Sequence, residues 1–211
     1  MDEERCSFEH WGSHQMRVAR LVFRVARALR LPEKTCLDYG QAGFLHDYGK
    51  QGRHIKHLFS KRKGKYTPEE RQLARTHTDV GVLLLDHRLK ARLEPEAYKI
   101  IKDGILHHHD DYGKHGNNIP MVARIIRVVD HFDAVTHRKR LSMHDAFREL
   151  LNHRGTWFDP VVVNVLIKDV LLPTRPRLAR LFPTKEEGAR INPEVCSAPP
   201  KHVKKHRLVL N

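Results

Sequence analysis

The chain has 211 residues, and its 39 Lys and Arg against 25 Asp and Glu give a formal charge of +14. A hydrophobic fraction of 40% spread among charged residues excludes a collagen-like chain and argues against wholesale disorder. No apolar run approaches the roughly 20 residues of a membrane span, and the acidic N-terminus lacks a signal peptide's apolar stretch. Three cysteines without a CxxC pair predict a reduced, cytoplasmic protein, and the positive charge favours an anionic partner.

Apolar residues recur at helical spacing along most of the chain, which predicts an all-α fold. In chain order, the predicted helices cover about residues 13–30, 37–46, 67–87, 95–109, 120–137, 142–153 and 160–172. The segment Thr67-Pro68-Glu69-Glu70 has the N-cap, the first-turn proline and the early acids of a helix start. The basic segment 51–66 and the polar segment 110–118 contain glycines and are predicted to be loops.

The chain becomes Pro-rich and basic after Pro173. We therefore expect a single domain over residues 1–172, followed by a basic tail over residues 173–211. The domain would be a bundle of about six to eight helices, because alternating apolar and polar runs that indicate strands are absent from the sequence.

Histidine is the unusual component of this chain, with 17 residues. Several of these histidines lie on the apolar stripes of the predicted helices, where each residue turns by about 100°. The His46-Asp47 pair ends an apolar helix in the same way. The polar residues predicted to face inward are His14, His46, Asp47, His77, His108, His109, Asp130 and Asp133, with His10 at the edge of the first stripe.

Burying so many imidazoles and carboxylates without partners would cost several kcal/mol in total, a cost that bound metal ions would remove. The set is too large for one tetrahedral zinc ion. It suits two octahedral first-row metals, Fe or Mn, with an Asp carboxylate bridging them. Any single histidine of the set is better interpreted as a hydrogen-bonded core or surface residue. The set as a whole indicates a metal centre.

Several short sequence motifs contain or flank these inward-facing residues. They read LHDYGKQG at 45–52, KGKYTPEE at 63–70, HTDVG at 77–81, HHD at 108–110, ARII at 123–126 with Asp130 and Asp133, and FDP at 158–160. In this order they resemble the HD superfamily of metal-dependent phosphohydrolases, over about residues 10–170. Within that superfamily they resemble the HD-GYP branch of cyclic di-GMP phosphodiesterases. The resemblance implies an HD-domain helical bundle.

The sequence departs from this branch in several places. The DGxGYP loop that should follow the paired histidines is shortened to residues 112–118, and the GYP triplet is absent. Family members with three metals carry a Glu one turn before the first His, where this chain has His10. The resemblance therefore favours two metals, unless His10 is itself a ligand. It carries over metal chemistry more directly than specificity for cyclic di-GMP.

The resemblance also implies roles for individual residues. The implied metal ligands are His14, His46, Asp47, His77, His108, His109 and Asp130, with Asp47 as the bridge. Asp47 and Lys50 are the implied catalytic residues, since Lys50 can neutralise charge on the phosphate or leaving oxygen; its alternative is a surface ammonium. Asp133 would orient a ligand. The family's RPYR segment is reduced here to Arg138-Lys139-Arg140, which would bind substrate phosphate or form a solvated basic cluster.

The sequence therefore predicts a metal-dependent phosphodiesterase acting on a nucleotide, with cyclic di-GMP as the most specific substrate. One alternative is a phosphodiesterase or phosphatase on RNA ends or other nucleotides, since phosphate contacts are independent of sequence. A second is a diiron oxygenase of the same superfamily, against which the flanking motifs argue. A third is a non-catalytic nucleotide or nucleic-acid binder, although none of the implied ligands has been lost.

Overall fold

The computed structural model describes the backbone of residues 3–60 and 66–175 and the side chains of 13–59 and 66–175. Within these ranges the chain forms helices and turns without a β-strand, and an isolated bridge pairs Arg154 with Phe158. The all-α prediction is confirmed. None of the described helices has the length and apolar character needed to cross a membrane. The side chain of His10 and the tail beyond residue 175 lie outside the described residues.

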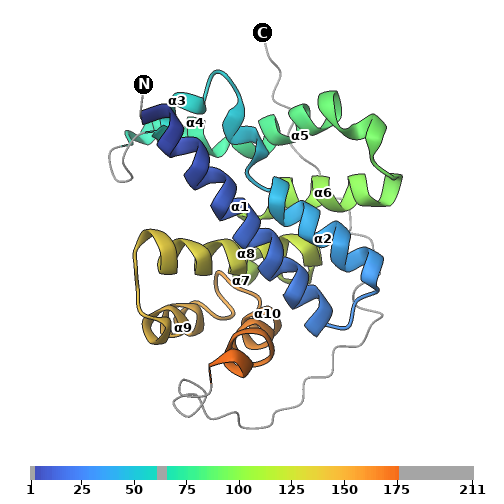
Figure 1. Ribbon diagram of the computed structural model, residues 1–211, viewed down its shortest axis with the longest axis vertical. Helices are drawn as coiled ribbons and strands as arrows, with labels where there is room; N and C mark the ends of the chain where they lie inside the picture. The colour runs from blue at the N-terminus through green and yellow to red at the C-terminus, as the bar shows by residue number, and fades with distance from the viewer. Residues whose placement is uncertain (1–2, 61–65, 176–211) are drawn as a thin grey trace.

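Four long helices form the centre of the bundle. Helix α1 (Glu3–Ala28) crosses the molecule diagonally in Figure 1 and packs against α2 (Glu33–Leu45) and α8 (Met121–Asp133). Helix α6 (Pro95–His107) packs against α2 and α8. Their apolar faces meet in the main core, which includes Val22, Ala42, Ile101, Ile105, Ile126 and Val129. Burying a large aliphatic side chain contributes about 1.5–3 kcal/mol, so this core fixes the relative positions of the four helices.

The C-terminal part of the described chain packs below these helices in Figure 1. Helix α8 continues as a π-helical turn over Ala134–Arg138, and α9 (Met143–Asn152) follows. Helix α10 (Pro160–Val165) runs on through π-helical turns over Leu166–Leu171. Asp159 caps α10 by accepting a hydrogen bond from the backbone N–H of Val161 at 2.8 Å, as its position before Pro160 predicts.

The predicted helix over 67–87 is two helices in the structure, α4 (Pro68–Arg75) and α5 (His77–Arg88). The start is as expected, because Thr67 and Glu70 form a capping box. The break lies at Thr76, whose ψ of −6° departs from helical geometry and whose hydroxyl donates to the Leu73 carbonyl at 2.7 Å. Such local hydrogen bonding competes with the helical ladder, so His77 begins a new helix.

The prediction of loops over 51–66 and 110–118 is wrong in part. Short helices occupy pieces of both segments: η1 (Tyr48–Gln51) and α3 (Lys56–Ser60) in the first, α7 (Tyr112–His115) and η3 (Gly116–Asn118) in the second. The first segment folds because Ile55 and Leu58 are fully buried, in a small core with Ala74. Because Ile55 and Leu58 lie among many basic residues, the sequence shows no apolar periodicity that would predict a helix here.

Candidate metal centre

The structure brings all seven implied ligands together at one end of the bundle. They come from helices far apart in the sequence, at points where the chain enters or leaves a helix or faces the core. His14 lies on α1, His46 and Asp47 follow α2, His77 begins α5, His108 and His109 follow α6, and Asp130 lies on α8. Their side chains form two clusters on either side of Asp47.

Cluster 1 consists of His14, His46 and Asp130, whose ligand atoms all lie within 4.8 Å of one another. The Oδ1 atom of Asp130 lies 3.4 Å from His14 Nε2 and 3.9 Å from His46 Nε2. His46 is fully buried. Three donor atoms of the types that bind first-row metals therefore converge from α1, the end of α2 and α8.

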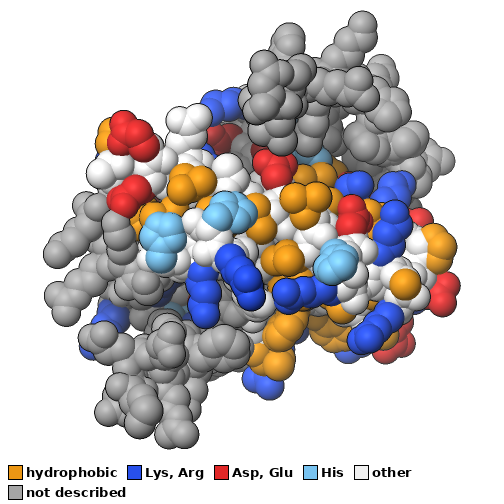
Figure 2. Space-filling model, turned by 90° about the horizontal axis from the view of Figure 1, so that it is seen from above, with side chains coloured by type: hydrophobic (Ala, Val, Ile, Leu, Met, Phe, Trp, Pro, Cys, Tyr) orange, Lys and Arg blue, Asp and Glu red, His pale blue; other side chains and the backbone are white. Residues whose placement is uncertain are grey.

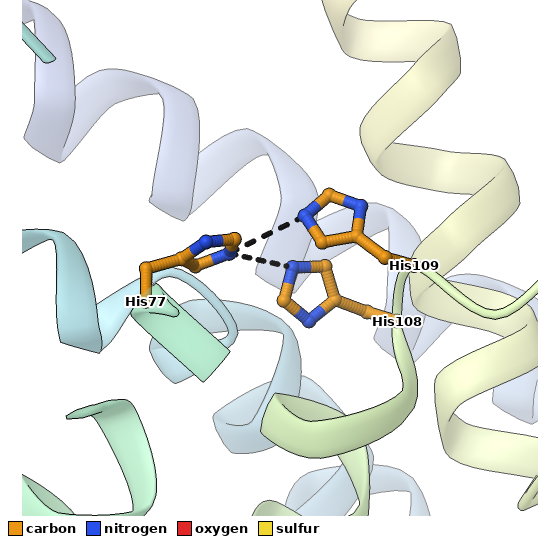
Figure 3. Close-up of side chains that lie close together, drawn as sticks. All are labelled: His77, His108 and His109. Atoms are coloured by element: carbon orange, nitrogen blue, oxygen red, sulfur yellow. Dashed lines mark hydrogen bonds between the residues drawn. The ribbon is translucent and has the colours of Figure 1, made fainter. Parts of the chain in front are cut away.

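Cluster 2 consists of His77, His108 and His109, and its ligand atoms also lie within 4.8 Å of one another. Figure 3 shows the three imidazole rings turned toward one another from two segments of the chain. The Nε2 atom of His77 lies 3.3 Å from Nε2 of His108 and 3.3 Å from Nε2 of His109. His77 and His108 are buried, whereas His109 is exposed. Cluster 2 is therefore open to solvent on the His109 side.

The Asp47 carboxylate lies between the two clusters. Its Oδ2 atom is 3.3 Å from His46 Nε2 and 3.9 Å from His14 Nε2, both in cluster 1. Its Oδ1 atom is 3.4 Å from His77 Nε2 and 3.8 Å from His108 Nε2, both in cluster 2. Asp47 is only 3% exposed. Each carboxylate oxygen thus faces one cluster, which is the placement that a bridging ligand requires.

Hydrogen bonds to the backbone fix the orientation of the buried imidazoles. The Nδ1–H group of His46 donates to the Gly43 carbonyl at 2.8 Å, that of His77 to the Ala74 carbonyl at 2.8 Å, and that of His108 to the Ile105 carbonyl at 2.9 Å. A carbonyl oxygen only accepts, and a neutral imidazole carries one N–H. In its neutral form, each ring therefore carries its free lone pair on Nε2, which points into the centre.

The residues of the centre fit divalent metal ions. Within the described part of the chain, His46 Nε2 and Asp130 Oδ1 are buried side-chain atoms without a hydrogen-bond partner. An unsatisfied buried polar atom costs about 1–3 kcal/mol, and the Nε2 lone pairs of His77 and His108 face each other because both rings carry their hydrogen on Nδ1. A cation bound by imidazole nitrogens and carboxylate oxygens would remove both costs.

The electrostatic environment differs among these groups. Burial opposes protonation of His46, but the nearby Asp47 and Asp130 carboxylates outweigh it and raise the pKa of this imidazole. Burial lowers the pKa of His77, and it lowers the pKa of His108 well below the ordinary value. Both imidazoles therefore remain neutral at physiological pH. Burial opposes ionisation of Asp47, but nearby His46 and Lys50 outweigh it and lower the pKa of the carboxyl well below its usual range.

Two glycines allow the His46-Asp47 segment to approach helix α5 closely. A Cβ atom on Gly49 would lie 1.8 Å from the carbonyl oxygen of His77 and 2.5 Å from the backbone nitrogen of Gly81. A Cβ atom on Gly81 would lie 2.7 Å from Ile105. Side chains at these positions would push α5 away, so both glycines serve to place His77 beside Asp47.

Asp133, predicted to orient a ligand, lies behind cluster 1 and is 1% exposed. It accepts a hydrogen bond from His14 Nδ1 at 2.7 Å. It also accepts two hydrogen bonds from Arg17, from Nε at 2.6 Å and from Nη2 at 3.0 Å. The sequence motifs do not single out Arg17 for this contact. The available signal was a buried acid in need of a cationic partner.

The predicted substrate-binding residues differ in how closely they approach the two clusters. The Lys50 ammonium contacts Asp47 and lies 5.2 Å from the centre of the Phe59 ring. Arg138 reaches the centre, with Nη2 3.9 Å from Asp130 Oδ1. Lys139 and Arg140 are exposed, and within the described residues no recorded contact joins them to either cluster.

A buried centre of imidazoles and carboxylates inside a helical bundle defines a class of metal-binding helical domains. The family model described as the HD domain matches residues 6–162. The chain belongs to the HD domain family, which confirms the family resemblance of its motifs.

Three similar proteins are named as phosphodiesterases of cyclic dinucleotides. The chain is 30% identical over 189 residues to a cyclic di-GMP phosphodiesterase of Pseudomonas aeruginosa. The aligned region covers 84% of this chain and 43% of the relative. It is 29% identical over 176 residues to a probable cyclic di-GMP phosphodiesterase of Vibrio cholerae, covering 74% and 40%. It is 29% identical over 167 residues to a 3'3'-cGAMP-specific phosphodiesterase of Vibrio cholerae, covering 74% and 31%. The chain spans less than half the length of these relatives.

Proposed function

We propose that this chain is a metal-dependent phosphodiesterase that hydrolyses a cyclic dinucleotide, with cyclic di-GMP as the preferred substrate. The placement of Asp47 carries the proposal, because one carboxylate oxygen faces cluster 1 and the other faces cluster 2. The names of the relatives supply the substrate class, since they include enzymes for cyclic di-GMP and for 3'3'-cGAMP.

Two divalent metal ions, Fe or Mn, would occupy the centre. His14, His46 and Asp130 would hold one ion, His77, His108 and His109 would hold the other, and Asp47 would contribute one oxygen to each. These donors are fewer than an octahedral ion accepts, so positions remain for water and substrate. The bound ions would supply a water molecule of lowered pKa and positive charge next to the phosphoryl oxygens.

The residues around the clusters would bind and orient the phosphodiester. Lys50, beside Asp47, would donate hydrogen bonds to a phosphoryl oxygen and offset negative charge that develops during hydrolysis. Arg138, beside Asp130, would hold a phosphate through its planar guanidinium. Lys and Arg side chains lie among histidines on the face shown in Figure 2, and they would attract an anionic substrate. Lys139 and Arg140 remain predicted phosphate contacts at the edge of this site.

In the proposed reaction, the oxygen of water forms a new bond to one phosphorus atom of the cyclic dinucleotide. The bond from that phosphorus to one ribose oxygen breaks, and the ribose oxygen leaves with a proton. The product is a linear dinucleotide with a terminal phosphate. We also infer a catalytic domain over residues 1–172, a tail over residues 173–211 and a cytoplasmic location.

The function can be tested with the purified chain, prepared without chelators. Its metal content would be measured by mass spectrometry. The protein would then be incubated with Mn²⁺ or Fe²⁺ and with cyclic di-GMP, 3'3'-cGAMP, a linear dinucleotide and an RNA oligonucleotide, and the products separated by chromatography. We expect a linear dinucleotide from cyclic di-GMP. Turnover of RNA alone would favour the alternative suggested by the charge of +14, and no turnover of any substrate by metal-loaded protein would contradict the proposal.

A further inference from the structure

We propose that Arg17 is a positioning residue that acts through Asp133 to hold the His14 imidazole in cluster 1. This inference rests on the proposed metal-dependent function. The Arg17 guanidinium donates a hydrogen bond to each oxygen of Asp133, from Nε to Oδ1 at 2.6 Å and from Nη2 to Oδ2 at 3.0 Å. Asp133 Oδ2 in turn accepts from His14 Nδ1 at 2.7 Å, and His14 Nε2 points to Asp130.

His14 needs this support because its Nδ1 partner differs from those of the other buried rings. His46, His77 and His108 each donate to a backbone carbonyl three residues earlier, which the helix itself holds in place. His14 donates instead to a side chain on α8, 119 positions away in the sequence. A carboxylate can rotate about its side-chain bonds, whereas a helical carbonyl cannot, so Asp133 must itself be held.

Arg17 is the residue best placed to hold Asp133. It comes one turn after His14 on α1, so both residues reach the same carboxylate from one helix. A guanidinium that donates two parallel hydrogen bonds fixes the plane of a carboxylate as well as its charge. His137 also approaches Asp133, with Nδ1 3.1 Å from Oδ1, but its side chain is 46% exposed and reaches this one oxygen.

The charge of Asp133 also affects His14 as a ligand. A carboxylate that accepts from Nδ1 makes Nε2 a stronger electron donor to a metal than a neutral carbonyl does. Asp133 is buried in the bundle, and a buried carboxylate keeps its charge at low cost only when it is paired and hydrogen-bonded. Arg17 supplies the charge of that pair and two of its hydrogen bonds.

The contacts from Arg17 lead through Asp133 to cluster 1, so loss of Arg17 should affect the binding of the two ions differently. Loss of such an outer hydrogen-bond partner typically weakens metal binding about 10–100-fold. Removing Arg17 should therefore weaken the ion of cluster 1 and leave the ion of cluster 2 unchanged. A residue that only packs α1 against α8 would change thermal stability without this difference between the two ions.

The experiment compares Arg17→Met and Arg17→Lys with Arg20→Met, a control at an exposed arginine of the same helix. Metal-free protein comprising residues 1–211 is titrated with Mn²⁺ in competition with a chelating dye, and thermal unfolding is followed in parallel. We expect two bound ions in the wild type and the control. In Arg17→Met, one ion should bind about 10–100-fold more weakly. Arg17→Lys keeps the charge but loses the bidentate fork and should show a smaller weakening.

Coupling to Asp133 provides the second measurement. In an Asp133→Asn background, Arg17→Met should weaken Mn²⁺ binding no further, because both changes interrupt the same contact. Wild-type affinity for both ions in Arg17→Met, or in Arg17→Lys if the former does not fold, would overturn the positioning role. A wild type that binds no Mn²⁺ would instead overturn the metal-dependent function on which the inference rests.

Discussion

The Nε2 atoms of His77 and His108 face each other at 3.3 Å, although each ring already donates its Nδ1 hydrogen to a backbone carbonyl. Two lone pairs at this distance repel each other unless a cation lies between them. His77 begins α5 and His108 follows α6. The main core, which includes Leu85 of α5 and Ile105 of α6, fixes the positions of these two helices. The bundle thus imposes an arrangement that a bound cation would stabilise.

Metal binding should therefore stabilise the fold. We expect the midpoint of thermal unfolding to rise with added Mn²⁺ and to fall after treatment with a chelator. At a free concentration 100 times the dissociation constant, one bound ion adds about 2.7 kcal/mol to the free energy of unfolding. Calorimetry with and without Mn²⁺ measures the shift. Identical unfolding curves in the two conditions would show that the clusters do not bind the ion.

The two clusters should respond differently to loss of a shared and an unshared ligand. Asp47→Ala removes an oxygen from both clusters, so we expect both ions to bind weakly or not at all. His109→Ala removes a proposed ligand of cluster 2 alone, so one ion should remain. Mass spectrometry of the purified variants gives the number of ions per chain. Equal metal content in the two variants would argue against the bridging position of Asp47.

Lys50 should affect hydrolysis more than metal binding. Lys50→Met removes a cationic donor beside Asp47, and the loss of one such donor typically lowers kcat about 10²–10³-fold. Metal content should stay at the wild-type level, because Lys50 offers no lone pair while it is protonated. Lys56→Met, at an exposed position of α3, is the matched control. A wild-type kcat in Lys50→Met would leave this side chain with a surface role only.

Gly49 gives a test of the close approach between the His46-Asp47 segment and α5. Gly49→Ala would place a methyl group 1.8 Å from the His77 carbonyl oxygen, and forced overpacking typically costs about 1–3 kcal/mol or more. Gly40→Ala meets its nearest atom, on Phe23, at 3.5 Å, so it should be neutral or slightly stabilising. Urea denaturation compares the two. Equal stability of both variants would contradict the packing role of Gly49.

The metal-free protein should lose stability in mild acid. Burial lowers the pKa of His108 well below the value of 6.5 that applies to the unfolded chain, and it lowers the pKa of His77 in the same direction. Below pH 6.5 the unfolded state therefore binds more protons, and stability falls as the pH falls toward the folded-state values. Each such imidazole contributes a slope of about 1.4 kcal/mol per pH unit.

Chemical denaturation of chelator-treated protein between pH 7.5 and 5.5 follows this loss, over a range set by the ordinary histidine pKa of about 6.5. His87→Gln, at an exposed position of α5, is the control substitution because it removes an imidazole outside the centre. Stability that is constant over this range would mean that the buried imidazoles exchange protons freely in the folded state.

Helical periodicity was sufficient to predict which residues meet in the centre, because it reports the face that a side chain occupies. His14 and Asp130 are on inward faces of α1 and α8, as their apolar neighbours indicate. The end of an apolar helix indicated His46 and Asp47, and the family motifs supported both residues. Each of these positions could be read from residues within a few turns of it.

Other features depend on distances between helices, which periodicity does not report. The pairing of Arg17 with Asp133 joins residues 116 positions apart, and it requires the crossing of α1 and α8. The break at Thr76 follows from a side-chain hydrogen bond within a segment whose apolar pattern continues. Helix α3 was missed because its buried residues, Ile55 and Leu58, lie among basic ones.

The hydrogen bonds of the buried imidazoles also tie the centre to the ends of helices. His46 and His108 are the C-cap residues of α2 and α6, and each donates to a carbonyl of the final turn that the helix itself leaves without a partner. The same side chain thus terminates a helix and presents its Nε2 atom to the centre. Replacing either histidine would fray a helix as well as remove a proposed ligand, so the position of each proposed ligand cannot change unless the helix ends elsewhere.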